Sequence, residues 1–353
     1  MTGLRRALVP LLALAVLAGA CTDDDEPADD ADTSVEVEDV LVASADDVIV
    51  PSYEALVTSF DELSSALDEL CAAPSPEALQ TARDAWREVA IAWRHTRAGG
   101  VGPAMTRRLA ATIAFAARPA AVEELLAGSD PVTEAAVDAD GAGVKGIVAL
   151  EIGLFGDGSD ELATAAGARR CEYLTSVTAL GRAASADVLA DWADGYRDEL
   201  IEGMDGDPQA SLDALVNEVI FRLTETDDQG LRALTEAATA EELQPARADG
   251  PAAFHLAELR ATYESVAAIL DEGELQSLVE ATNADTGERL AEAADTAAEA
   301  MAALPDSVTA SFDDPDTVAE AQAAVMALKV LLSTEVASEL GITLGFSDSD
   351  GDS

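Results

Sequence analysis

The stretch Val48-Ile-Val-Pro-Ser-Tyr-Glu-Ala-Leu-Val-Thr-Ser-Phe-Asp-Glu-Leu-Ser-Ser-Ala-Leu-Asp-Glu-Leu70 decides the fold class, because its apolar side chains recur at steps of three and four residues. That period places them on one face of an α-helix. Pro51 lies early enough to belong to the first turn, where proline is well tolerated. The apolar face consists of Ile49, Tyr53, Leu56, Phe60, Leu63, Leu67 and Leu70.

The same period recurs along the whole chain. It predicts helices over residues 75–93 and 168–200 in the first half, and over 254–270, 285–304 and 315–340 in the second. Hydrophobic residues make up 49% of the chain but aromatic residues only 4%, so the core is mostly Ala, Leu and Val, which suits closely packed helices better than sheets. The sequence therefore predicts an all-α protein of two related helical bundles packed together, over residues 47–205 and 206–353.

The N-terminal residues 1–20 have the features of a lipoprotein signal peptide. Arg5 and Arg6 precede an apolar run too short to span a bilayer, and small residues lead up to Cys21. We expect cleavage and lipidation at Cys21, which would tie the mature chain to the membrane outside the cytoplasm; plain secretion is the alternative. Residues 21–46 are acidic and poor in large apolar side chains, which predicts a disordered tether.

The charge balance excludes one class of partner. Asp and Glu number 69 against 20 Lys and Arg, which gives a net charge of −49. Nucleic-acid binding is excluded because it needs clustered cations, and contact with an anionic membrane through a basic face is disfavoured for the same reason. A saline habitat, or a composition shared across the proteins of the source, would each account for the acidity.

Two cysteines remain once Cys21 is set aside, Cys71 and Cys171. In an oxidising compartment the default interpretation of such a pair is a disulfide, and neither residue has a Cys-x-x-Cys spacing or a nearby His that would indicate metal or redox chemistry. We predict a bond that joins the end of the first helix to the start of a later one.

The stretch Gly146-Ile-Val-Ala-Leu-Glu-Ile-Gly-Leu-Phe-Gly156 places one carboxylate, Glu151, within an otherwise apolar run. Burying a carboxylate is costly unless a cation, a metal or several donors meet it. Glu151 is therefore a candidate for binding an ion or a ligand, and a salt bridge to an Arg on a neighbouring helix is the structural alternative.

Several motifs, in their order and spacing, resemble the imelysin family of extracytoplasmic bacterial proteins. The Gly146–Gly156 segment is similar to the family signature Gly-x-His-x-x-Glu followed by Leu-Leu-Trp/Phe-Gly. The resemblance implies a pair of four-helix bundles with a candidate site at their junction, and a periplasmic or cell-surface setting tied to iron or other metal handling. It also implies a metallopeptidase-like activity for some members. The other matching segments are Val48–Tyr53, Ala82–Trp86 with Trp93, Gly102-Pro103, Arg170–Tyr173 and Leu340–Asp352.

One residue departs from the family pattern, because Val148 stands where the histidine belongs. A His and a Glu three residues apart share a helix face and could ligate one metal, whereas valine ligates nothing. Zinc hydrolysis needs about three protein ligands and a bound water, a set that this segment does not supply. Glu151 could instead accept a bond from Arg83, Arg87 or Arg94, or join other carboxylates in an oxygen-only metal site.

Four further residues are relevant to the site: two tryptophans and a His–Glu pair. Trp86 and Trp93 share a helix face and are expected in the core, with ligand stacking as the minority hypothesis for both and Trp93 as the ligand-binding candidate. His255 and Glu258 have the His-x-x-Glu spacing but lack the apolar Leu-Phe-Gly sequel, so a relocated metal site there is a weaker hypothesis than a solvated pair on the helix surface.

The sequence therefore favours a lipid-anchored, imelysin-like protein that acts as a non-catalytic binding or accessory component in iron or metal acquisition. Its cofactor is unknown, with a divalent metal or iron as the candidate, and metal-transport components are the candidate protein partners. A metallopeptidase-like enzyme and a structural cell-envelope protein are the two alternatives. No catalytic residue is assigned.

Overall fold

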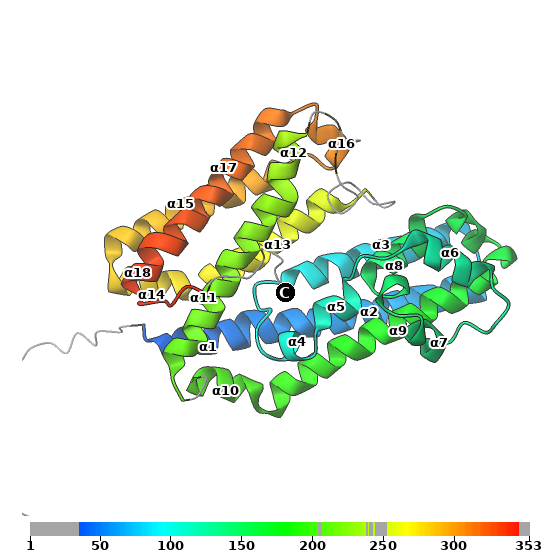
Figure 1. Ribbon diagram of the computed structural model, residues 1–353, viewed down its shortest axis with the longest axis horizontal. Helices are drawn as coiled ribbons and strands as arrows, with labels where there is room; N and C mark the ends of the chain where they lie inside the picture. The colour runs from blue at the N-terminus through cyan, green and yellow to red at the C-terminus, as the bar shows by residue number, and fades with distance from the viewer. Residues whose placement is uncertain (1–34, 204–205, 238, 240–242, 244–252, 346–353) are drawn as a thin grey trace, which may run out of the picture. The chain divides into compact units, whose positions relative to one another are not determined.

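The computed structural model describes residues 35–203, 206–237, 239, 243 and 253–345, and its described part is helical without β-strands (Figure 1). The all-α prediction is confirmed. The signal peptide, Cys21 and residues 22–34 of the expected tether lie outside the described residues.

The first group of helices contains α2 (Val50–Ala72), α3 (Pro76–His95), α8 (Ile147–Phe155) and α9 (Ala168–Asp191). Helix α2 packs along both α3 and α9, and α8 packs on α3 and α9. Pro51 lies in the first turn of α2, as expected. Ser75 caps α3, because its hydroxyl accepts a hydrogen bond from the backbone N–H of Ala78 at 3.1 Å.

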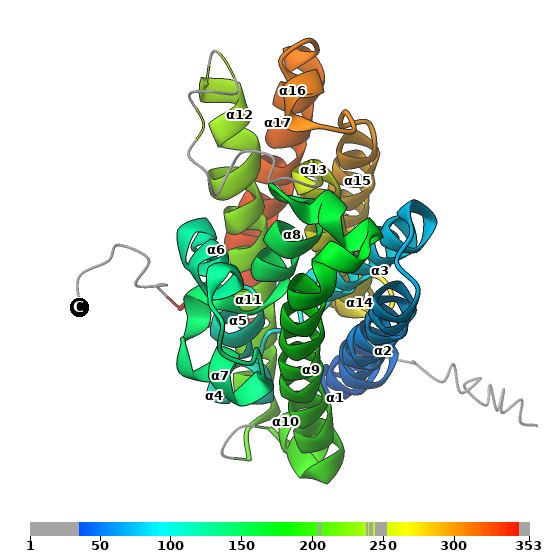
Figure 2. The same ribbon diagram turned by 90° about the vertical axis from the view of Figure 1, so that its right-hand side faces the viewer.

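Short helices fill the chain between α3 and α8. They are α4 (Pro103–Thr106), α5 (Leu109–Ile113), α6 (Pro119–Ala127) and α7 (Glu134–Ala139). Helices α4, α5 and α7 lie against α9, and α6 lies against α8 and α9 (Figure 2). Among these short helices, α6 is therefore the one that packs on α8.

The second group contains α11 (Pro208–Glu225), α13 (His255–Leu270), α15 (Ala284–Ala302) and α17 (Pro315–Leu331). These four form a closed arrangement, because α11 contacts α13 and α17 while α15 also contacts both. Helix α17 with its continuation is the described helix that is long and apolar enough by composition to cross a membrane. Here one of its faces packs on α11 and α15, and 33% of the apolar window is buried. The smaller helices are α12 (Arg232–Glu236), α14 (Leu275–Thr282), α16 (Val308–Ser311) and α18 (Ala337–Glu339).

The tether prediction is wrong for its last residues. Residues 37–43 form α1 (Val37–Ala43), which continues through a π-helical turn into α2. Val40, Leu41 and Ala45 are fully buried, and α1 packs on α10 (Arg197–Glu202), α11 and α14. The apolar side chains of this short segment are therefore enough to order it once tertiary partners are available, despite its acidic composition.

The helix predicted over residues 168–200 is interrupted near its end. A π-helical turn at Trp192–Tyr196 separates α9 from α10, and Gly195 adopts a φ of 129° inside it. Glycine tolerates this conformation, which bends the chain and turns α10 away from the axis of α9.

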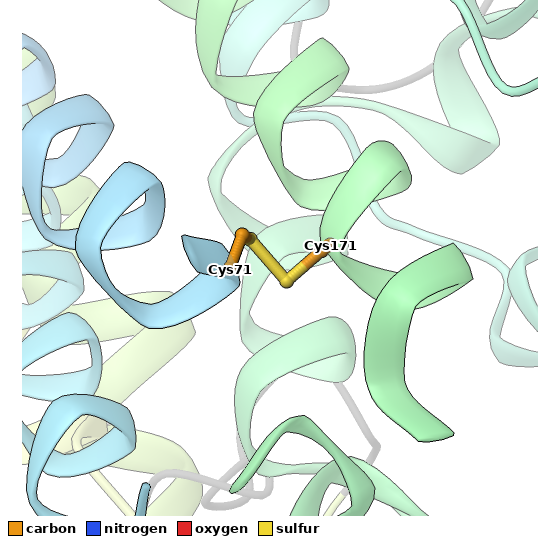
Figure 3. Close-up of a disulfide and its surroundings, with 2 residues drawn as sticks. All are labelled: Cys71 and Cys171. Atoms are coloured by element: carbon orange, nitrogen blue, oxygen red, sulfur yellow. A yellow bond between two sulfur atoms is a disulfide. The ribbon is translucent and has the colours of Figure 1, made fainter. Parts of the chain in front are cut away.

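The predicted disulfide is present between Cys71 and Cys171 (Figure 3). Cys71 lies in the last turn of α2 and Cys171 in the first turn of α9, with a Cα–Cα distance of 5.8 Å. The bond therefore fastens the two longest helices of the first group at one end.

The two helix groups meet along a seam, formed by α3 and the loop 96–102 from the first group and by α11 and α13 from the second. Helices α3 and α13 pack on each other. The backbone N–H of Ala98 donates to the Ser265 hydroxyl at 3.2 Å, and the Ser44 hydroxyl donates to the Gly273 carbonyl at 3.2 Å. Buried polar bonds at both places fix how the two groups contact each other.

Candidate functional site at the seam

Helix α8 places Glu151 on the only half-exposed face of an otherwise buried helix. Gly146 starts the helix with a φ of 89°, and a Cβ there would lie 2.6 Å from the carbonyl oxygen of Ile113, so the position requires glycine. Val148, Glu151 and Phe155 are half-buried and follow one another at three- and four-residue steps, so they share a face. Glu151 takes part in at least one interaction within the protein. The buried residues of α8 are Ile147, Ala149, Leu150, Ile152, Gly153 and Leu154.

Trp86 joins this helix to the second group. Its ring packs edge-on against Phe155 with centroids 5.1 Å apart and lies 6.1 Å from the ring of Phe254, which immediately precedes α13. The indole N–H donates to the Ile147 carbonyl at 3.0 Å. Trp86 is a core residue, as expected, and it brings the end of α8 and the start of α13 to the same part of α3.

Two arginines of α3 lie over the same phenylalanine. The guanidinium carbons of Arg83 and Arg87 are 5.3 and 5.1 Å from the centroid of the Phe155 ring, and that of Arg87 is also 5.9 Å from Phe254. Arg83 donates to the Leu154 carbonyl at 2.8 Å and to the Ser159 hydroxyl at 3.1 Å. The structure therefore brings Arg83 to the C-terminal end of the Glu151 helix, where a cation also complements the helix dipole.

The His255–Glu258 motif lies on the same seam. The Glu258 carboxylate forms an ion pair with Arg94 of α3 at 3.2 Å. His255 is the first residue of α13. His95, at the end of α3, has its Nε2 2.9 Å from a carboxylate oxygen of Glu264. Among the described residues, no group of three or more His, Cys, Asp or Glu side chains is placed to hold a metal ion.

Trp93 is almost fully buried, with 3% of its surface exposed, and the guanidinium carbon of Arg97 lies 4.9 Å above its ring. It packs in the core beside the seam, as the main hypothesis expected. Its burial and the guanidinium above it leave little of this ring accessible to a ligand.

A cluster of buried charges that the sequence analysis did not single out lies at the centre of the seam. Arg222 of α11 pairs with Glu218 at 2.8 Å and with Glu225, and Arg97 pairs with Glu225 at 3.5 Å. The side chain of Arg222 is only 5% exposed. Ion pairs this deep are costly to desolvate, so each charge depends on its partners.

The protonation equilibria in this cluster reflect burial and neighbouring charge. Burial, together with the positive charge of Arg222, lowers the pKa of Arg97 to about 10. Burial raises the pKa of Glu218, against the opposing effect of Arg222 and Arg97. Burial also acts to raise the pKa of Glu225, but Arg222, Arg97 and Arg94 together outweigh it, so the pKa of Glu225 is lowered. Burial raises the pKa of Tyr53, whose hydroxyl donates to the Gly99 carbonyl at 3.4 Å.

One sequence signal could have found part of this cluster. Glu218, Arg222 and Glu225 follow one another at four- and three-residue steps in an amphipathic helix, which places three charges on one face. Their partner Arg97 comes from a loop far earlier in the chain, and only the tertiary fold brings it to them.

The seam thus has guanidinium groups, aromatic rings and carboxylates, but no clustered metal donors among the described residues. This combination is suited to holding polar or anionic groups by charge-assisted hydrogen bonds. Fold and site together define a class: an all-helical protein of two helix groups with a charged seam between them.

Comparison with known proteins identifies the family. The imelysin family model (peptidase M75) matches residues 49–334, so the chain belongs to the imelysin family. A crystal structure of an imelysin-like protein from Psychrobacter arcticum 273-4 has a TM-score of 0.74 and 19% identity, covering 88% of this chain and 98% of that one. A second crystal structure, assigned as an iron-regulated protein A precursor from Parabacteroides distasonis ATCC 8503, has a TM-score of 0.71 and 18% identity. The match covers 86% of this chain and 95% of that one. Comparison with curated proteins finds no match.

Proposed function

We propose that this protein is an extracytoplasmic, lipid-anchored component of iron or other metal acquisition that binds or presents its cargo and does not catalyse a reaction. Membership of the imelysin family and the fold shared with a protein assigned as iron-regulated support the setting. The features of residues 1–21 support lipid attachment at Cys21 and work outside the cytoplasm.

The side chains of α8 that could ligate a metal are the reason for proposing that the protein does not catalyse a reaction. Val148 and Glu151 share the half-exposed face of this helix, so the family's imidazole position is occupied by a side chain that cannot ligate. The described residues also offer no other group of three ligating side chains. A metal-activated water for hydrolysis needs about three protein ligands, so these residues do not fit a catalytic metal centre.

Glu151 and Arg83 are the proposed ligand-binding residues at this place. Arg83 is fixed by its hydrogen bonds to the Leu154 carbonyl and the Ser159 hydroxyl. Its guanidinium also lies over the ring of Phe155, which belongs to the half-exposed face of α8. A side chain held in this way binds with little loss of conformational entropy.

Iron uptake in a deletion strain tests the proposal. We expect deletion to lower uptake and growth under iron limitation, and the wild-type gene to restore both. Glu151→Gln should restore less than the matched control Glu124→Gln, which changes an exposed carboxylate on α6. Cys21→Ala should release the protein from the membrane fraction.

Two outcomes would overturn the proposal. Normal iron and metal uptake combined with a defective envelope would support the structural alternative instead. Peptide cleavage by the purified chain that is lost in Glu151→Gln would support the metallopeptidase-like alternative.

A further inference from the structure

The arginines of α3 form a stripe along the seam. Arg83, Arg87 and Arg94 are separated by four and seven residues, which places them on one face of the helix. Their side chains are between 21% and 30% exposed, so all three are sheltered yet reachable from solvent. In a chain with 20 Lys and Arg against 69 Asp and Glu, such a sheltered row of guanidinium groups is unusual.

The aromatic rings hold two of these cations in place without satisfying their N–H groups. Arg83 and Arg87 lie over Phe155, and Arg87 also lies over Phe254. A ring contacts the face of a guanidinium by cation–π attraction and leaves its edges for hydrogen-bond acceptors. The planar N–H fork matches a carboxylate with two parallel hydrogen bonds.

The carboxylates that pair with Arg83 and Arg87 are weak competitors for a ligand. Arg87 pairs with Asp84, which is 61% exposed, and Arg83 pairs with Asp160, which is 94% exposed. Exposed ion pairs contribute little net stability, so an incoming anion can replace these partners. The repulsion from the chain's remote negative charges is screened beyond ~8 Å at physiological ionic strength.

The same region is a poor site for a bare metal cation, because the described residues offer no three clustered donors and Val148 supplies none. An iron ion that arrives already chelated needs no protein ligands. Its chelator then presents carboxylates, which are the groups that this stripe is able to bind.

We propose that the Arg83–Arg87–Phe155 face of the seam binds a polycarboxylate anion, and that iron reaches this protein as the anionic chelate of such a compound. This inference rests on the proposed function and names its cargo. Arg87 makes the main contact, since the described structure uses only one of its nitrogens, in the pair with Asp84. Arg83 positions the site through its bonds to α8 and the following turn.

Isothermal titration of the full chain with citrate, ferric citrate, and ferrous or zinc ions without chelator tests this. We expect both citrate forms to bind, and Arg87→Gln to weaken that binding roughly tenfold to a hundredfold, the range for losing a charge-assisted hydrogen bond. The affinity of Arg87→Lys for citrate should lie between those of the wild type and Arg87→Gln, because lysine keeps the charge but lacks the planar fork. The matched control is Arg182→Gln, which removes an arginine of α9, outside the seam, that likewise pairs with a single aspartate, Asp61.

Three results would overturn the inference: no binding of either citrate form, equal loss in Arg87→Gln and Arg182→Gln, or tighter binding of unchelated metal than of ferric citrate. The failure of this inference is distinguishable from failure of the proposed function. If ferric citrate does not bind but deletion still lowers iron uptake, only the polycarboxylate site is wrong.

Discussion

Removing the disulfide between Cys71 and Cys171 should destabilise the protein strongly. The two residues are separated by 100 positions, so the bond closes a long loop in the unfolded chain. The chain-entropy relation gives about 4.7 kcal/mol at 25 °C for a loop of this length, and measured values are often smaller. We therefore expect Cys71→Ser/Cys171→Ser to lower the free energy of unfolding by about 2–4 kcal/mol, the usual range for one bond.

Urea denaturation followed by far-UV circular dichroism measures this loss of stability. The parent protein and the double variant both carry Cys21→Ala, so that no third thiol interferes. The variant should unfold at lower urea, and a reductant should bring the parent protein to the same midpoint while leaving the variant unchanged. Equal midpoints for parent and variant without reductant would refute the reasoning. Two thiols titrating in the denatured, unreduced parent would refute it as well.

Three further perturbations test the seam. Arg222→Met leaves Glu218 and Glu225 buried without their main partner and should cost about 3–5 kcal/mol in denaturant unfolding; a loss below 1 kcal/mol would show that water reaches these carboxylates. Trp86→Ala empties a buried site between α8 and α13 and should cost about 3–5 kcal/mol by the same assay, and wild-type stability would contradict the packing described. The pKa of Glu225 is held below its ordinary value of 4.5, so its contribution is present above that pH and is lost as pH falls through the lower, folded-state value. Glu225→Gln should therefore reduce the acid-induced loss of stability below about pH 4.5, and an unchanged pH profile would contradict this.

The helices were predictable because each long one carries a continuous apolar stripe, as α2 does from Tyr53 to Leu70. The helix in segment 37–46 could not be predicted in this way, because the apolar stripe of this segment is short. Val40 and Leu41 are buried where α1 contacts α10, α11 and α14, all of them far away in sequence. An isolated segment of this length would not be stable as a helix, so composition alone favoured a tether.

The candidate site was predictable only in part. The glycines and apolar residues around Glu151 marked α8 as a buried helix with one charge, and the structure brings Arg83 to its end. The contacts of Trp86 with Phe254 and of Arg97 with Glu225 join segments more than a hundred residues apart. No local pattern encodes such a pairing, so the buried ion cluster became visible only in the folded chain.

The metal content of the full chain tests most directly whether α8 lacks a metal centre, which is the central claim. The protein would be purified without chelators from cells supplied with iron and zinc, and analysed by mass spectrometry of the elements. We expect well under one metal ion per chain, with the same value for Glu151→Gln. One tightly held iron or zinc per chain that disappears in Glu151→Gln would contradict the claim.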